Sequence, residues 1–402
     1  MVKRIKTRMI DPIARIGTLD PFSSALPILA FFAKTGALPF LPVRREDGLI
    51  AFETSICQWV LHWLYLIFPF AVQLALIGNC FAQGIGLDEA LSILTIPGLS
   101  FLDLLCQVGT SFASALAAFP MSVALTKKRN TFNKVFEDVA NLWARLDCPK
   151  SINILGKTAT RLSGFYAVLG AVYVTLGMVN VVILSGMPFM LSIPISAFNV
   201  VVGLTLHSMV FNYLFIHTTD VWIAIMKSWI NKMDGPQAQC ENADILFDIL
   251  NCIKDIDDCF GPLLFIDIGL AFVVHIFTLF FLFSSYNIII AFHRSYLLFL
   301  AMMVILQIMI TAKFSFLFVR GTALSQEMRN ARRSLQDWRM RLNQDSLPED
   351  QKYSLNVLES RLGEHEALKP MGAFTLDSST STAAIGLMMT YMVVLLQFKT
   401  AS

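Results

Sequence analysis

The chain has 402 residues, of which 55% are hydrophobic and only 15% are charged, and its formal net charge is +2. Soluble domains carry about 25% charged residues, so this composition excludes an ordinary soluble protein and predicts an all-α membrane protein with several spans. The sequence has no C-x-x-C pair, no metal-ligand spacing of His, no Gly-rich phosphate loop and no nucleophile motif. We therefore expect no enzyme, no metal or cofactor site and no nucleic-acid partner.

Residues 1–54 form a basic N-terminal segment that is too irregular to cross a membrane. Its apolar part, residues 21–42, contains four prolines and Lys34. Proline inside a helix removes a hydrogen bond and breaks the helix. The pattern predicts short helices in the cytosol or at the membrane surface rather than a spanning helix.

Seven apolar stretches follow, each of about the length that a helix needs to cross a bilayer. The stretches cover residues 55–81, 99–125, 162–184, 190–216, 260–283, 288–319 and 383–398. A turn with Gly186 and Pro188 joins the third and fourth stretches, and the polar residues 284–287 join the fifth and sixth. Residues 55–319 thus hold the first six predicted spans.

The basic residues alternate between the connections of these spans. Of the 31 Lys and Arg residues, 28 lie in the N-terminal segment and in the second, fourth and sixth connections, whereas the first, third and fifth connections carry none. Basic residues accumulate on the cytosolic side of membrane proteins. We therefore expect the N-terminus in the cytosol and, after seven crossings, the C-terminus outside. This orientation excludes a G-protein-coupled receptor, which keeps its N-terminus outside.

Residues 320–380 contain the longest regular pattern among the connections. Apolar residues recur at helical spacing from Leu324 to Trp338, and charged residues fill the opposite face. A second charged helix is expected over residues 354–368. Two interpretations are open: a solvated cytosolic hairpin, or helices that extend the sixth span and pack against other copies of the chain. The acidic fourth connection, residues 220–258, is expected to be helical, either against the sixth connection or beneath a cation pathway.

The last stretch, within residues 381–402, carries polar side chains that a helix facing only lipid would avoid. Thr390, Val394 and Gln397 share one face of a helix, because they are spaced by four and seven residues. Copies of this helix around an axis can form a pore with Thr390 and Gln397 as polar rings and Val394 as an apolar collar. Gln397 and Phe398 lie at its outer end and are expected to form the constriction. The alternative is an ordinary anchor helix whose Gln bonds to a neighbour.

A second group of polar residues lies in the outer half of the predicted spans. Such groups are costly inside a membrane and indicate function by default. The predicted ligand-binding residues are Asp103, Gln107, Asn180, His275, Arg294 and Tyr296. Three of them also have a structural alternative. Asp103 pairs with Arg294, His275 is a neutral core residue bonded to a backbone carbonyl, or Arg294 extends to the outer membrane surface.

Thr390-Tyr391, five apolar residues and then Gln397-Phe398 resemble the C-terminal signature of insect gustatory receptors. The resemblance implies seven spans in the orientation that the basic residues also predict. It implies a ligand-gated, non-selective cation channel of the plasma membrane, assembled as a homotetramer or with related receptors. The last helix of each subunit would line the pore, and cytosolic ends of the later spans would hold the subunits together. The partners would be a small tastant entering from outside, the lipid bilayer, and Na⁺, K⁺ and Ca²⁺ ions.

The resemblance leaves the ligand and the mode of signalling open. Sugar receptors of that family often carry an acidic residue directly after the Thr-Tyr pair, where this chain has Met392. A fructose-type, bitter or other ligand is therefore open besides a common sugar. Two further classes are a receptor that signals through partner proteins without conducting ions, and a transporter. The sequence contains no internal repeat and no pair of broken helices, which disfavours the transporter.

Overall fold

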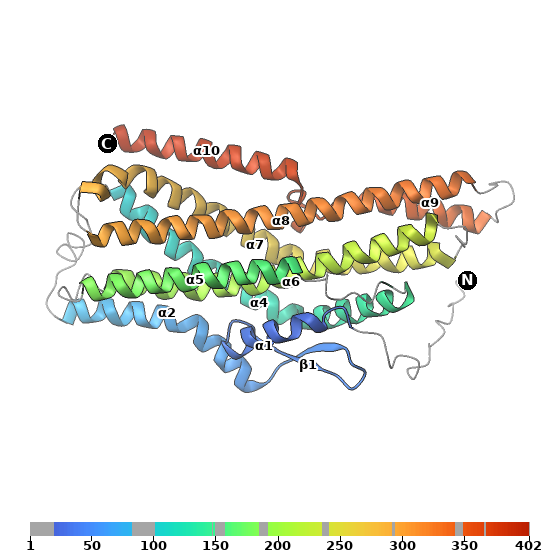
Figure 1. Ribbon diagram of the computed structural model, residues 1–402, viewed down its shortest axis with the longest axis horizontal. Helices are drawn as coiled ribbons and strands as arrows, with labels where there is room; N and C mark the ends of the chain where they lie inside the picture. Colours follow the sequence, from blue (N-terminus) through green and yellow to red (C-terminus); the bar gives the residue numbers. More distant parts are fainter. Residues whose placement is uncertain are drawn as a thin grey trace.

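The computed structural model describes residues 20–82, 101–146, 148, 157–184, 192–234, 241–291, 294–341, 349–365 and 367–401. In this part of the chain, six long helices form an elongated bundle and run roughly along its longest axis (Figure 1). The six are α2 (Ile56–Ala82), α4 (Phe101–Arg145), α5 (Lys157–Leu184), α6 (Ser192–Asp234), α7 (Glu241–Ala291) and α8 (Arg294–Arg341). The predicted, mainly helical fold is thereby confirmed.

Four of these helices are much longer than a membrane is thick. α4, α6, α7 and α8 contain 45, 43, 51 and 48 residues. At 1.5 Å per residue each reaches about 65–75 Å, more than twice the hydrocarbon core of a bilayer. The second, fourth and sixth connections are therefore largely continuations of the helices that hold the predicted spans.

Four apolar helical stretches among the described residues are suited to cross a membrane by length and composition. They are Met209–Met233 in α6, Ile245–Phe280 in α7, Leu300–Arg341 in α8 and Ser378–Phe398 in α10 (Ser378–Ala401). α2 and α5 contribute shorter apolar stretches, Ile56–Phe68 and Ser163–Tyr173. Seven crossings and the orientation of the chain remain predictions.

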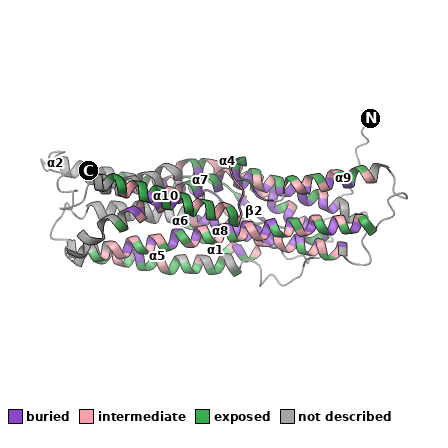
Figure 2. Cartoon of the chain, turned by 90° about the horizontal axis from the view of Figure 1, so that it is seen from above, coloured by how far each residue is buried: buried purple, intermediate pink, exposed green. Residues whose placement is uncertain are grey.

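The main hydrophobic core lies toward the end of the bundle that holds α9 (Glu349–Glu364), where buried residues gather in Figure 2. Phe132 of α4, Trp222 and Trp229 of α6 and Trp338 of α8 are buried in it. Large aromatic side chains each remove about 150–250 Å² from water. This end of the bundle is therefore held together by packing within one chain.

The helical stripe predicted in residues 320–380 lies inside this core. Met328, Ala331, Leu335 and Trp338 are each at most 5% exposed. They belong to one buried cluster with side chains of α4, α6 and α7 of the same chain. Packing of this region against other copies of the chain remains a prediction. The solvated interpretation was wrong, whereas the second was right that the helix extends the sixth span, and the stripe itself is buried within its own chain. The reason is that α8 runs unbroken from its apolar part into the stripe.

Charged residues also join these helical continuations. On α7, Asp255 lies 2.5 Å from Lys134 of α4, and Asp248 contacts Arg145 of α4. The acidic fourth connection is helical as predicted, and these two carboxylates pair with the basic second connection.

The fourth connection also lies against the sixth, as one alternative predicted. Arg320 of α8 is 3.3 Å from Asp220 of α6. Lys227 of α6 is 3.5 Å from Glu327 of α8, and α9 contacts α7. α9 begins at Glu349, five residues before the predicted start.

The N-terminal segment folds differently from the prediction of short helices alone. α1 (Leu26–Lys34) is followed by a β-hairpin of β1 (Leu41–Arg44) and β2 (Ile50–Glu53). The strands pair antiparallel, with Leu41 opposite Glu53. Each strand has four residues, which is too short for an alternating pattern to stand out in the sequence.

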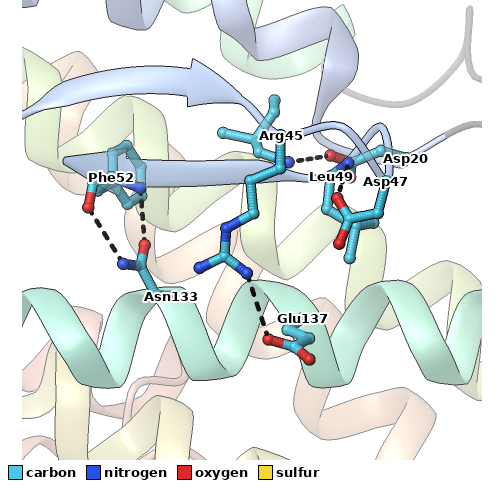
Figure 3. A network of polar contacts seen from close by, with 8 residues as sticks. Asp20, Arg45, Asp47, Leu49, Phe52, Asn133 and Glu137 are labelled. Carbon is cyan, nitrogen blue, oxygen red and sulfur yellow. Dashed lines mark hydrogen bonds and ion pairs between the residues drawn. The ribbon is translucent and has the colours of Figure 1, made fainter.

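Polar contacts fasten the hairpin to α4 (Figure 3). Asn133 accepts the Phe52 N–H at 2.7 Å, and its amide nitrogen donates to the Phe52 carbonyl at 3.1 Å. Arg45 lies 3.7 Å from Glu137 on the surface. The turn between the strands places Gly48 at a φ of 84°, a left-handed conformation that glycine adopts without cost. The hairpin is thus a fixed part of the bundle.

The break between α7 and α8 lies later than predicted. α7 continues through residues 284–287 to Ala291, and α8 begins at Arg294. Residues 284–287 contain neither Gly nor Pro. Polar side chains alone do not end a helix, and in apolar surroundings the helix is what satisfies the backbone.

Candidate pore helix and ligand-binding residues

α10 contains the predicted pore residues and begins five residues before the predicted span. Asp377 caps it, because its carboxylate accepts the Thr380 N–H at 2.9 Å. This hydrogen bond holds the pKa of Asp377 below its usual range. The Thr375 hydroxyl donates to the same carboxylate at 2.9 Å. A local network of polar side chains therefore determines where the apolar helix starts.

Little of α10 is buried by its own chain. Only 11% of its apolar stretch is buried, compared with 78% for the stretch in α6, 50% in α7 and 39% in α8. Met388 and Met392, one turn apart, are its buried large side chains among the described residues. α10 contacts α7 and α8 and lies along the edge of the bundle (Figure 1). An apolar helix with this exposure requires lipid or other copies of the chain to cover it.

The four predicted pore residues lie on the exposed part of α10. Val394 is 37% exposed, Phe398 is 64% exposed, and Thr390 and Gln397 are exposed as well. At about 100° per residue, Thr390 and Gln397 lie on the side opposite the two buried methionines. The Thr390 hydroxyl donates to the Gly386 carbonyl at 2.9 Å within the helix. The predicted row therefore points away from its own chain.

Most of the predicted ligand-binding side chains lie outside the described part of the structure. Asp103 and Gln107 belong to α4, Asn180 to α5, and Arg294 and Tyr296 to the first turn of α8. α5 and α8 contact each other along the bundle. Convergence of these side chains on one ligand remains a prediction.

The described member of that set, His275, lies half-buried on α7 against α8. The amide nitrogen of Gln307 is 2.8 Å from His275 Nδ1, and the Phe314 ring lies edge-on to the imidazole at 6.3 Å between centroids. The alternative predicted for His275 was a bond to a backbone carbonyl, and the structure gives a side-chain amide instead. Gln307 was missed, although an amide within an apolar run is a signal that the sequence contains.

A buried ion pair is a second polar contact between α7 and α8. Lys313 Nζ lies 2.5 Å from Asp267 Oδ1, and the two side chains are 10% and 0% exposed. Removing one partner of such a pair leaves an uncompensated buried charge, which is strongly destabilising. Lys313 was recognised inside its predicted span, but Asp267 was not singled out. One carboxylate and one amine in neighbouring apolar runs were the available signal.

An open polar groove of about 430 Å³ lies on the α6 and α8 continuations. Lys227 and Glu327, 3.5 Å apart, lie on it together with Arg333 and Asp337. None of the predicted ligand-binding residues lines this groove. Its mixed charges indicate a solvated surface rather than a selective site for one kind of ion.

Taken together, these features define a helical protein of the membrane-spanning class, with a chain-terminal apolar helix that its own chain leaves mostly uncovered. A family model described as 7tm Chemosensory receptor matches residues 102–402. The chain therefore belongs to this chemosensory receptor family. This confirms the resemblance to insect chemoreceptors, while the gustatory subtype remains a prediction.

The fold is also similar to solved insect receptor structures. One is the olfactory receptor OR5 from Machilis hrabei in complex with eugenol, with a TM-score of 0.64 and 13% sequence identity, covering 97% of this chain and 100% of that chain. A second structure of the same receptor has a TM-score of 0.61 and 14% sequence identity, and the match covers 93% of this chain and 97% of that chain. No curated protein sequence matches the chain. At these identities the likeness shows the fold.

Proposed function

We propose that this protein is a ligand-gated, non-selective cation channel of the plasma membrane that acts as a gustatory receptor for a small tastant. Four copies meet with their α10 helices around a shared axis. The N-terminus of each subunit lies in the cytosol, and the C-terminus lies outside. The ligand is a sugar such as fructose, or a bitter compound.

The observation that carries this proposal is the exposure of α10. Its apolar stretch is 11% buried by its own chain, and the side opposite its buried methionines presents Thr390 and Gln397. Lipid would cover the apolar part, but hydrocarbon does not solvate an exposed amide such as that of Gln397, which is costly. When copies of α10 surround a water-filled axis, the apolar side chains are covered by neighbouring helices and lipid, and the polar side chains contact water. Gln397 and Phe398 then form the narrow outer end of the pore, and Phe398 contributes an apolar barrier when the pore is closed.

The ligand acts by binding the open state more tightly than the closed state. It binds in the outer half of the bundle among Asp103, Gln107, Asn180, His275, Arg294 and Tyr296. A tenfold preference at one site is worth about 1.4 kcal/mol, or roughly 5.5 kcal/mol over four sites. A difference of that size moves a two-state equilibrium from mostly closed to mostly open. Eugenol in the structure of the Machilis receptor shows that a small organic molecule binds a protein of this fold.

Purified protein in a planar bilayer tests conduction directly. A panel of sugars and bitter compounds is applied, and current is recorded with no other protein present. We expect at least one compound to open cation-conducting pores. Ligand binding without any current would instead support a receptor that signals through partner proteins.

Gln397→Ala tests the assignment of the pore. We expect altered single-channel conductance or basal opening with unchanged surface expression, because the variant removes a polar ring from the narrow end. Ile385→Ala is the matched control, since Ile385 is 59% exposed on the same helix but about a third of a turn away. Wild-type conductance and gating in Gln397→Ala would place the pore elsewhere.

A further inference from the structure

Residues 368–377, called the strap here, connect the end of α9 to the start of α10 and fold into a compact loop. The Leu376 N–H donates to the Leu368 carbonyl at 2.9 Å and closes the loop. Inside it, Met371 has a φ of 52° and Gly372 has a φ of 70°. A left-handed conformation is unfavourable for a residue with a side chain. Such a conformation persists only where the surroundings impose it.

The surroundings are the backbones of α7 and α8, and the strap contacts both at a glycine. A Cβ on Gly261 of α7 would lie 3.4 Å from the Met371 nitrogen. A Cβ on Gly321 of α8 would overlap the Leu376 carbonyl oxygen and lie 2.6 Å from its Cγ. Leu376 itself is completely buried. The strap therefore lies directly on the surface of α8, at a place where only glycine leaves enough room.

The two helices that carry the strap are themselves cross-linked. The buried Lys313–Asp267 pair joins α8 to α7 about two turns from Gly321. Arg320, next to Gly321, lies 3.3 Å from Asp220 of α6. Buried ion pairs resist separation, because breaking one leaves a charge in a poorly solvated place. The strap thus sits on a rigid platform of three helices.

Beyond the strap, α10 is held only lightly. The strap ends in the Asp377 cap of α10, and Phe374 of the strap stacks on Phe265 of α7 with 6.5 Å between centroids. From there to Phe398, the apolar stretch of α10 is 11% buried by its own chain. The base of this helix is therefore fixed, whereas its remaining length depends on contacts with other molecules.

We propose that the strap is the pivot of α10 and that Gly321 is its positioning residue. This inference rests on the proposed function of α10 as the pore helix. The closed and open states differ by a tilt of α10 about the strap, and the depth at which the strap sits on α8 sets the balance between them. A side chain at position 321 lifts the strap from α8 and shifts that balance without touching the side chains that line the pore.

Gly321→Ala tests the pivot with two measurements. Hydrogen exchange of the purified protein reports whether the Leu376 amide loses protection, and we expect an acceleration of about tenfold or more. Single-channel recording reports gating, and we expect basal opening or the half-maximal ligand concentration to change by about threefold or more at unchanged conductance. Gly269→Ala is the matched control, because a Cβ on this α7 glycine meets nothing within 4 Å. It is expected to change neither quantity.

Leu376→Ala provides a second variant that adds no bulk, in case Gly321→Ala fails to fold. It removes the buried anchor of the strap and is expected to move exchange and gating as Gly321→Ala does. Faster exchange with wild-type gating in either variant would overturn the pivot. Unchanged hydrogen exchange in both variants would contradict the described contact between the strap and α8 at Gly321. Absence of ligand-dependent current in the wild type would instead reject the proposed channel function, and exchange would still report on the seat.

Discussion

Asp20 connects the β-hairpin to the segment that precedes α1. Its side chain is 4% exposed, and its carboxylate accepts the N–H groups of Phe22 and Ile50, both at 2.9 Å. Burial raises the pKa of this carboxyl above its ordinary value of 3.8, and the two N–H donors oppose that shift only in part. The folded protein therefore holds the Asp20 proton to a higher pH than the unfolded chain does.

This difference in pKa between the folded and unfolded chain predicts how the free energy of unfolding changes with pH. A carboxyl whose pKa is raised by folding contributes stability that is fully present below the unfolded pKa and is lost as pH rises through the folded pKa. From about pH 4 upward, we expect Asp20 to reduce the free energy of unfolding by at most about 1.4 kcal/mol per pH unit, until the folded pKa is passed. The Asp20→Asn variant should lack this part of the slope, as measured by thermal unfolding at a series of pH values.

Asn133→Ala is the control for that measurement. It removes both hydrogen bonds to the Phe52 backbone but no titrating group, so it should lower the unfolding temperature equally at every pH. An Asp20→Asn protein with the full wild-type slope would show that burial of this carboxyl does not carry the effect.

At the scale of single elements, α8 shows how one helix serves two environments. Its first part is apolar, and its continuation carries charged residues on one side and the buried stripe on the other. Arg339 of the charged side lies 2.9 Å from Glu359 of α9. Surface pairs of this kind contribute little stability. The buried stripe must therefore supply most of the free energy that holds the continuation in place.

The stripe is tested by two substitutions two residues apart. Trp338 is 5% exposed and Met340 is 72% exposed. We expect Trp338→Ala to destabilise the protein by about 3–5 kcal/mol, because it removes an aromatic side chain from a packed core. Met340→Ala should change stability by less than about 0.5 kcal/mol. Denaturant unfolding measures the free energy of unfolding of both variants. Equal losses in the two variants would contradict the packing described for α8.

At the scale of the whole molecule, the core and the candidate pore helix are separate. Among the described residues, the main hydrophobic cluster ends, in chain order, at Leu376 and takes no side chain from α10. Folding of the bundle and assembly around α10 are therefore expected to be separable, because most of the packing that stabilises one chain lies outside that helix.

Truncation of the chain after Asp377 tests this separation. We expect the shortened protein to keep its unfolding temperature within about one degree, which corresponds to about 1 kcal/mol at this size. The mass of the purified assembly, measured by light scattering, should fall to that of smaller species. Removal of residues 399–402 alone is the control and should preserve the mass. An unfolded truncated chain would show that α10 stabilises the bundle, and an unchanged mass would show that other surfaces hold the copies together.

Features that depend on local sequence were predictable in this chain. The mainly helical class follows from long apolar runs, and the C-terminal residues from Thr390 to Phe398 pointed to the chemosensory family that the comparison shows. That Thr390, Val394 and Gln397 share one side of the last helix was also expected from their spacing. Each of these signals lies within one helix, where periodicity and length carry the information.

Features that depend on distant residues were not predictable. The four-residue strands of the hairpin are stabilised by Asn133, about 80 residues further along, and no local sequence pattern predicts that contact. Asp267 and Lys313 are 46 residues apart. The apolar stripe from Met328 to Trp338 was visible in the sequence, but the helices that cover it were not. Helical periodicity predicts that one face is buried and does not identify the segments that bury it.

The amino-acid sequence by itself determined that this is a helical protein of the membrane class, which family it belongs to and which apolar helix carries the row of Thr390, Val394 and Gln397. Hydrophobic length and fixed spacing are properties of a single helix, so the sequence contains them directly. Only the tertiary structure decided that the α8 stripe is covered by its own chain, that α10 is almost uncovered and that Gly321 seats the strap. Those properties depend on how helices lie against one another, and that placement is set by the packing of side chains brought together from separate parts of the chain.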